Sequence, residues 1–423
     1  MIIALYKKII NIWNISFSNK FIRNLGWFGV AQLVVRVSRL LATVVLARSL
    51  TQYDYGLAAI VLTIYEFINV FTTTGISTKI VQADDEEVES LCTTAYWLNW
   101  IIYPSLFVLQ CVLAFPISKI YHDERLIVPI CLLSLNYLFG PIGNIQASLI
   151  ERENRLKIIA IGSALQLSVG NILSALFAYF GFGIWAIILP KILSFPIYNL
   201  VNLTNHPWRN RNKFRIDGWQ KLLRFGLNIM GLSLLNTFRN NLDYLIVGKL
   251  LGVKELGLYY FAFNAGLGIS QTIINAISSS LYPHLCALKN EYSKFKESFY
   301  KTLKIIALLI VSFVIFQTSL AHFYVPIIFG AKWVPAIPIL ILICLSAIPR
   351  PFFDSATSLL IAVGKPNLSL GWDLIFTVLF GLLILVGTYW NITGVAVAVL
   401  VSYFAFTPIY LWWSTRKVFF SHR

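Results

Sequence analysis

Apolar runs of about twenty residues, separated by short polar segments, recur along almost the whole chain. A helix rises about 1.5 Å per residue, so a run of about twenty residues can cross the ~30 Å hydrocarbon layer of a bilayer. The pattern therefore predicts an all-α polytopic membrane protein with about twelve transmembrane helices. The predicted spans are 28–48, 56–79, 92–115, 126–149, 156–180, 182–203, 225–247, 257–283, 303–325, 335–362, 367–388 and 392–414.

Lysine and arginine residues are distributed unequally between the two sides that these spans define. With alternating spans, 23 lie on the side of the termini and 6 on the opposite side. Cytoplasmic loops carry the excess of positive charge, so both termini are predicted to be cytoplasmic. Residues 1–27 mix basic with large apolar residues and lack the uninterrupted apolar core of a signal peptide. We expect them to form an amphipathic segment on the cytoplasmic surface.

An internal repeat divides the chain into two halves. Residues 48–57 resemble residues 249–258, and three matched pairs are each 201 positions apart: Arg48 with Lys249, Asp54 with Glu255, and Gly56 with Gly257. The longest cytoplasmic loop lies between the halves. We therefore predict an N-lobe at 28–203, a basic linker at 204–224 and a C-lobe at 225–423, related by a parallel pseudo-repeat around a central cavity.

Composition excludes several classes of function. Residues of the hydrophobic class make up 58% of the chain and charged residues 12%, about half the charge of a soluble domain. Cytoplasmic loops account for the net charge of +16, so no nucleic-acid partner is expected. The five cysteines and five histidines show no metal-ligand spacing, and there is no nucleophile elbow or phosphate loop. We expect no enzyme activity, no cofactor, no metal and no catalytic residue.

Charged residues inside the predicted spans are the candidate site residues. A charge at the bilayer centre costs roughly 2.5–3.5 kcal/mol on insertion scales, so such side chains usually face a partner or water. The candidate substrate-binding cations are Arg36, Arg39, Lys191, Arg239 and Arg350. The candidate coupling or ion-pairing acids are Glu66, Asp243, Asp354 and Asp373.

Arg36 and Arg39 are three residues apart, so they share one helix face. Glu66 on the next span can neutralise one of them, and Lys191 adds further positive charge. Guanidinium groups match phosphate oxygens, so a lipid diphosphate is the ligand that this pattern favours. A purely structural network of the two arginines with Glu66 is the alternative.

The remaining candidates other than Asp373 fall in pairs or beside prolines. Arg239 with Asp243, and Arg350 with Asp354, stand four residues apart, so each pair can form an ion pair that is either structural or functional. Prolines flank Arg350 and precede Lys191, which predicts helix breaks at both places. Broken helices beside a charge are typical of transporter sites and hinges.

Several segments resemble one known family. They are residues 46–56, 80–84, 95–99, 146–157 and 181–186, of which the Tyr-Asp-Tyr-Gly sequence at 53–56 is the most specific. The chain resembles the polysaccharide transporter family, the flippases for repeat units of O-antigen and exopolysaccharide. These belong to the multidrug/oligosaccharidyl-lipid/polysaccharide exporter superfamily.

This resemblance implies that an undecaprenyl-diphosphate-linked oligosaccharide is moved by alternating access from the cytoplasmic to the periplasmic leaflet of the bacterial inner (plasma) membrane. Coupling to H⁺ or Na⁺ is known within the superfamily, although no coupling motif here matches residue for residue. The polymerase and glycosyltransferases of the pathway are candidate partners besides membrane lipids. In such relatives cationic cavity residues hold the diphosphate, and the positions of Arg36 and Arg39 match that placement.

Two other functions fit the same scaffold. A multidrug or cation antiporter would have an acidic cavity, whereas the intramembrane charges here are five positive and four negative. Cell-wall lipid-precursor flippases typically have two more spans than the twelve predicted here. Both remain alternatives at this point.

Overall fold

The computed structural model describes residues 20–72, 75–214, 219–268 and 291–419, together with six residues between 269 and 290. These residues form helices and connecting turns, and no β-strand occurs among them. All twelve predicted spans fall on helices, although part of 257–283 and the predicted segment 1–27 up to residue 19 lie outside the described residues. The predicted all-α fold is confirmed.

Seven helical stretches among the described residues are long and apolar enough to cross a membrane, or eight if one bent pair forms a single span. The bent pair is Glu124–Phe139 with Asn144–Arg152, at 53°, and it coincides with the predicted span 126–149. The longest stretch, Pro366–Phe419, contains two helices that the sequence predicts as separate spans. The protein is thus a multi-pass membrane protein, whereas the number twelve stays a prediction.

Contacts within the chain divide it into two compact units. The N-unit comprises Met1–Leu50 and Ile64–Thr237, and the C-unit comprises Thr51–Thr63 and Phe238–Arg423. The start of the second predicted span thus belongs to the C-unit. The boundaries predicted for the lobes and the linker remain predictions.

The N-unit contains the helices of the first half. They are α2 (Lys20–Ser49), the end of α3 (Gln52–Asn69), η1 (Val70–Thr72), α4 (Ile76–Gln82), α5 (Asp85–Tyr121), η2 (Glu124–Leu126), α6 (Ile127–Leu133), α7 (Leu135–Phe139), α8 (Asn144–Arg152), α9 (Leu156–Tyr179), α10 (Trp185–Asn205) and the start of α11 (Trp219–Leu250).

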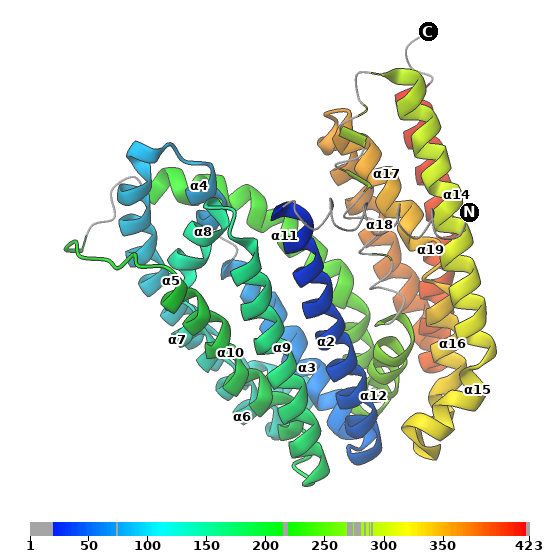
Figure 1. Cartoon of the computed structure of the whole chain (residues 1–423). Helices are drawn as coiled ribbons and strands as arrows, with labels where there is room; N and C mark the ends of the chain where they lie inside the picture. Colours follow the sequence, from blue (N-terminus) through cyan, green and yellow to red (C-terminus); the bar gives the residue numbers. More distant parts are fainter. Residues whose placement is uncertain are drawn as a thin grey trace, which may run out of the picture. The chain divides into compact units, whose positions relative to one another are not determined.

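Helices α2, α9 and α10 run side by side in the N-unit, with α9 in the middle (Figure 1). Val35 and Ala42, seven residues apart, are buried on one face of α2. Between them the Asn171 side-chain amide of α9 donates a hydrogen bond to the Ser38 hydroxyl (3.1 Å). This bond and the apolar contacts fix which face of α2 turns away from α9.

The C-unit begins with the first residues of α3 and continues from α11. Its further elements are α12 (Val253–Ala262), the π-helix η3 (Phe263–Leu267), α14 (Tyr292–Ser319), α15 (Ala321–Tyr324), the π-helix η4 (Val325–Phe329), η5 (Ala331–Ala336), α16 (Ile337–Leu345), α17 (Arg350–Ala362), α18 (Pro366–Gly387), η6 (Thr388–Trp390) and α19 (Asn391–Phe419).

The two copies of the internal repeat pack against each other in the C-unit. A methyl group on Gly56 would overlap the Val253 carbonyl oxygen, and one on Gly257 would overlap that of Gln52. Both pairs of partners are related by the repeat distance of 201 residues, so the contact is symmetric. Only glycine lets the two backbones approach this closely. The symmetric contact explains why the repeat keeps a glycine at both positions and why the start of α3 belongs to the C-unit.

Candidate functional site

Arg36 and Arg39 lie on α2, and both side chains are exposed. The α9-facing side of the helix is formed by Val35, Ser38 and Ala42, so the arginines project beside that contact rather than into it. Within the described part of the chain, neither guanidinium group forms a hydrogen bond or an ion pair. Both are therefore available to an anionic ligand.

Lys191 of α10 is close to two other candidate residues. Glu66 of α3 and Arg39 of α2 both act electrostatically on its ammonium group, Glu66 by attraction and Arg39 by repulsion. Lys191 and Glu66 are exposed as well. Three helices of the N-unit thus bring two cations and one carboxylate together, and Arg36 adds a third cation from the same face as Arg39. With two or three cations and one carboxylate, these described side chains carry a net positive charge, and their role in binding a substrate stays a prediction.

The helix breaks predicted from prolines have different outcomes in the two halves of the chain. Helix α10 continues from Trp185 to Asn205 through Pro190, so the helix break predicted before Lys191 is wrong. A proline lacks one donor but a membrane helix can bend around it without ending. In the second half α16 ends at Leu345 and α17 begins at Arg350, which confirms the predicted break there.

Arg239 forms a salt bridge with Asp373 of α18, with 2.6 Å between its terminal nitrogen and the carboxylate. The pairing with Asp243, predicted from the four-residue spacing on α11, is not the contact that the structure shows. Helix α18 places a carboxylate opposite Arg239, and the guanidinium also lies 5.7 Å from the centroid of the Phe353 ring. Arg239 is therefore already engaged within the C-unit.

Asp243 is buried and accepts two hydrogen bonds, from the Tyr259 hydroxyl (2.7 Å) and the backbone N–H of Tyr244 (2.9 Å). Arg350 acts on it electrostatically, and its guanidinium group lies 4.2 Å from the centroid of the Tyr403 ring. Asp354 follows one turn later on α17 and is half-buried. Arg239 and Arg350 are thus held by acids and aromatic rings, unlike Arg36 and Arg39 of the N-unit.

The described residues contain no cluster of three or more histidine, cysteine, aspartate or glutamate side chains that could hold a metal ion. The arrangement can bind an anion in the N-unit and can hold a proton or a charge pair in the C-unit. Both assignments remain predictions.

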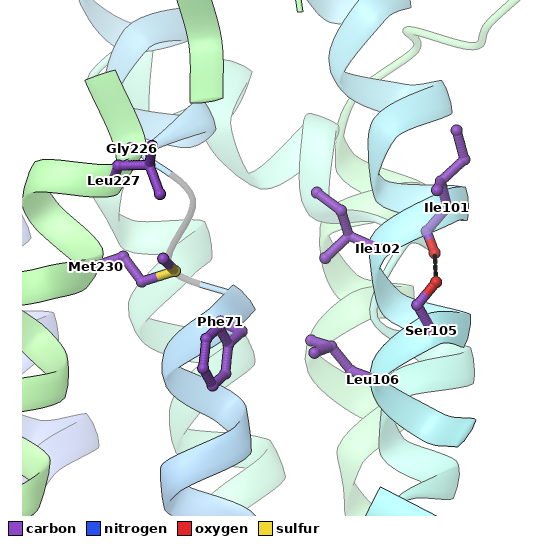
Figure 2. Close-up of a pocket in the computed structure, with 8 residues that line it drawn as sticks. All are labelled: Phe71, Ile101, Ile102, Ser105, Leu106, Gly226, Leu227 and Met230. Carbon is purple, nitrogen blue, oxygen red and sulfur yellow. Dashed lines mark hydrogen bonds between the residues drawn. The ribbon is translucent and has the colours of Figure 1, made fainter. Parts of the chain in front are cut away.

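The N-unit also contains an apolar cavity of about 310 Å³, between α5 on one side and η1 and the start of α11 on the other. Figure 2 shows Phe71, Leu227 and Met230 facing Ile102 and Leu106 across it. None of the residues that line this cavity was among the candidates predicted from the sequence. Its lining residues repeat along α5 with the spacing of any lipid-facing helix, so no signal in the sequence distinguishes them.

Comparison with solved structures identifies the fold as that of membrane transporters. The chain superposes on the lipid II flippase MurJ in an inward closed conformation with a TM-score of 0.74 and 14% identity, covering 92% of this chain and 87% of that one. It superposes on an inward-facing multidrug resistance MATE family transporter with a TM-score of 0.72 and 14% identity, covering 90% and 94%. At this identity the likeness shows the fold alone.

Relatives in sequence identify the family. The chain is 26% identical to an uncharacterised membrane protein in the cps region of Klebsiella pneumoniae, over 90% of this chain and 79% of that protein. It is 25% identical to the lipopolysaccharide biosynthesis protein WzxC of Escherichia coli K12, over 88% and 76%. The family described as "Polysaccharide biosynthesis protein" matches residues 45–338. The chain belongs to this family, which confirms the resemblance seen in the sequence.

Proposed function

We propose that the protein is a flippase that moves an undecaprenyl-diphosphate-linked oligosaccharide, the repeat unit of a surface polysaccharide such as O-antigen, across the bacterial inner membrane. The family and its named relatives support a role in polysaccharide biosynthesis. The fold supports transport, since it is shared with a lipid flippase and a drug exporter. The termini and the basic linker lie in the cytoplasm in this proposal.

The observation that carries the proposal is the exposed cationic group on the N-unit. Among the described residues, Arg36, Arg39 and Lys191 outnumber the carboxylate that acts on Lys191, that of Glu66. Positive charge that is not neutralised by the protein needs an anionic ligand at membrane depth, because an uncompensated charge there is costly. A diphosphate supplies two or more negative charges, and each guanidinium group can bind its oxygens through two parallel hydrogen bonds.

The acids of the C-unit are assigned to ion coupling. Asp243 is the strongest candidate, because it is buried and has two hydrogen-bond donors and the charge of Arg350 around it. Asp354 is a second candidate, whereas Asp373 is engaged by Arg239. Protonation or Na⁺ binding at Asp243 would weaken its attraction to Arg350 and so favour a different packing of α11 and α17.

The test is replacement of both arginines by alanine in a strain whose surface polymer depends on this gene. We expect the polymer to be lost while the protein still reaches the membrane, because the diphosphate loses its binding groups. The double change to lysine should retain part of the activity, since it keeps the charge but not the planar fork. Lys119→Ala, which removes an exposed cation elsewhere in the N-unit, is the matched control. Normal polymer from the double alanine variant would contradict the site, and resistance to cationic dyes on overexpression would favour a drug antiporter.

A further inference from the structure

The thiol groups of Cys111 on α5 and Cys131 on α6 lie together where these two helices of the N-unit pack. The Cys131 sulfur is 3.9 Å from the backbone carbonyl oxygen of Cys111, to which its S–H donates. The Cys111 side chain also acts directly on the Cys131 thiol, by charge and by hydrogen bonding. One residue earlier on each helix, the Gln110 side-chain amide donates a hydrogen bond to the Ile130 carbonyl oxygen (2.7 Å). The two cysteines therefore face each other across a close contact between the helices.

Ser134, directly after the last residue of α6, orients the second thiol. Its hydroxyl donates a hydrogen bond to the Cys131 carbonyl oxygen (2.6 Å) and lies 3.4 Å from the Cys111 sulfur. A serine hydroxyl has one hydrogen, so with that hydrogen used the Cys111 thiol is the donor to the serine oxygen. Each thiol is thus held either against the other cysteine or against the serine that is hydrogen-bonded to it.

This arrangement meets the main condition for a disulfide bond. Such a bond joins sulfur atoms about 2.05 Å apart and forms only where the two backbones are close. The Cys131 sulfur reaches the Cys111 backbone itself, as the bond requires. Cys92 and Cys344 are buried, and no second cysteine acts on their thiols, whereas Cys286 is exposed. Within the described part of the chain, one pair of thiols is therefore arranged for a disulfide bond.

The two thiols lie at about the same depth, and both side chains are half-buried. Cys111 is four residues before the end of the predicted span 92–115, and Cys131 is five residues after the start of the predicted span 126–149. At 1.5 Å per residue, both are about 6–8 Å inside the ends of these spans. In the predicted orientation these ends face the periplasm, an oxidising compartment in which disulfide bonds persist.

The position inside the predicted spans limits the oxidant to a small uncharged molecule, because a charged one enters hydrocarbon only at a large free-energy cost. Hydrogen peroxide meets this condition. It first transfers a hydroxyl group to the sulfur of one thiol, which gives a sulfenic acid and one water. The sulfur of the second thiol then displaces that hydroxyl, so the S–S bond forms and a second water leaves with the proton of the second thiol. The two sulfur atoms together lose two electrons, and the peroxide is reduced to water.

We propose that Cys111 and Cys131 form a reversible oxidation site, in which a small peroxide converts the two thiols into a disulfide bond that ties α6 to α5. The inference does not depend on the proposed function. Helix α6 belongs to the first part of the bent pair, Glu124–Phe139 with Asn144–Arg152. The bond would therefore fix the first half of this broken span against α5. A dithiol reductant restores both thiols by thiol–disulfide exchange.

The test uses the purified full-length protein in detergent, treated with hydrogen peroxide. Remaining thiols are blocked with N-ethylmaleimide, the protein is reduced, and the released thiols are labelled with deuterated N-ethylmaleimide and quantified at each cysteine by mass spectrometry. We expect equal release at Cys111 and Cys131, and before reduction a joined pair of peptides that contains both. Release at Cys92 and Cys344 should be lower by about tenfold or more, because only a neighbouring thiol acts at an effective concentration on the order of millimolar.

Cys111→Ser removes one partner with little change in size, so reversible oxidation of Cys131 should fall by about tenfold or more. Cys111→Ala is a second variant, in case serine disturbs the packing, and thermal unfolding checks that each variant is folded. Cys92→Ser is the matched control and should leave the oxidation of the pair unchanged. Absence of the joined peptides at a peroxide concentration that oxidises the exposed Cys286 would overturn the inference. So would unchanged reversible oxidation of Cys131 in the folded Cys111 variants, which would assign its partner elsewhere.

Discussion

The symmetric contact between the two repeats makes a sharp prediction about Gly257. A methyl group there would overlap the carbonyl oxygen of Gln52 and lie 2.7 Å from its carbonyl carbon, where ordinary contacts are 3.4 Å or more. The obstructing atoms belong to backbone, so no side-chain rotation can relieve the overlap. The starts of α3 and α12 must therefore move apart by more than the 0.7 Å (3.4 Å less 2.7 Å) that the carbonyl carbon alone requires, because the carbonyl oxygen lies closer still.

Overpacking of this kind typically lowers the free energy of unfolding by about 1–3 kcal/mol. We expect the loss in Gly257→Ala to be about 3 kcal/mol or more. Thermal unfolding of the purified protein in detergent should show an apparent Tm lower by at least about 5 °C. Gly56→Ala should behave similarly, because its methyl group would lie 2.8 Å from the Val253 carbonyl carbon. The double variant should cost less than the two single changes together, since one separation of the helices relieves both overlaps.

Gly371→Ala is the matched control for this prediction. It lies inside α18 and a methyl group there meets no atom within 4 Å. Alanine is favoured over glycine within a helix by up to about 1 kcal/mol, so this variant should be as stable as the wild type or more stable. A Gly257→Ala protein with an unchanged Tm would refute the reasoning that the two repeats are held together by backbone contact.

Two further predictions concern charged groups. Asp373→Asn removes the carboxylate that lies 2.6 Å from the guanidinium group of Arg239, so we expect the free energy of unfolding to fall by about 3 kcal/mol, measured by thermal unfolding. Exchanging the two residues should recover part of this loss. Full stability of Asp373→Asn would contradict the pairing. Outside the predicted spans, the hydrogen bond from Arg155 holds the pKa of Glu153 below its ordinary value of 4.5, with a smaller contribution from His206. The lowered pKa means that this stabilisation is complete above pH 4.5 and is lost as the pH falls through the lower pKa of the folded protein. Proteolysis of the linker at Trp208 should therefore become faster in acid. Glu153→Gln lacks the charge at every pH, so its rate of proteolysis should show no such change with pH.

The sequence alone determined the helical membrane fold, the family and the repeat. These follow from features that are local or periodic: apolar runs of membrane length, the bias of basic residues to one side, and a motif repeated at a distance of 201 residues. The bilayer allows little else, because every backbone polar group within it must be satisfied inside a helix. The break before Arg350 was also predicted from neighbouring prolines, although the same argument was wrong at Pro190.

Contacts between helices were decided by the tertiary structure. Spacing on one helix suggested Asp243 as the partner of Arg239, but Asp373 on α18 forms the salt bridge and Tyr259 on α12 holds Asp243. The cavity beside α5 needed the start of α11 as its opposite wall. A sequence shows which residues share a helix face, whereas the partner across that face depends on which helices pack together, and that is settled by the whole set of contacts at once.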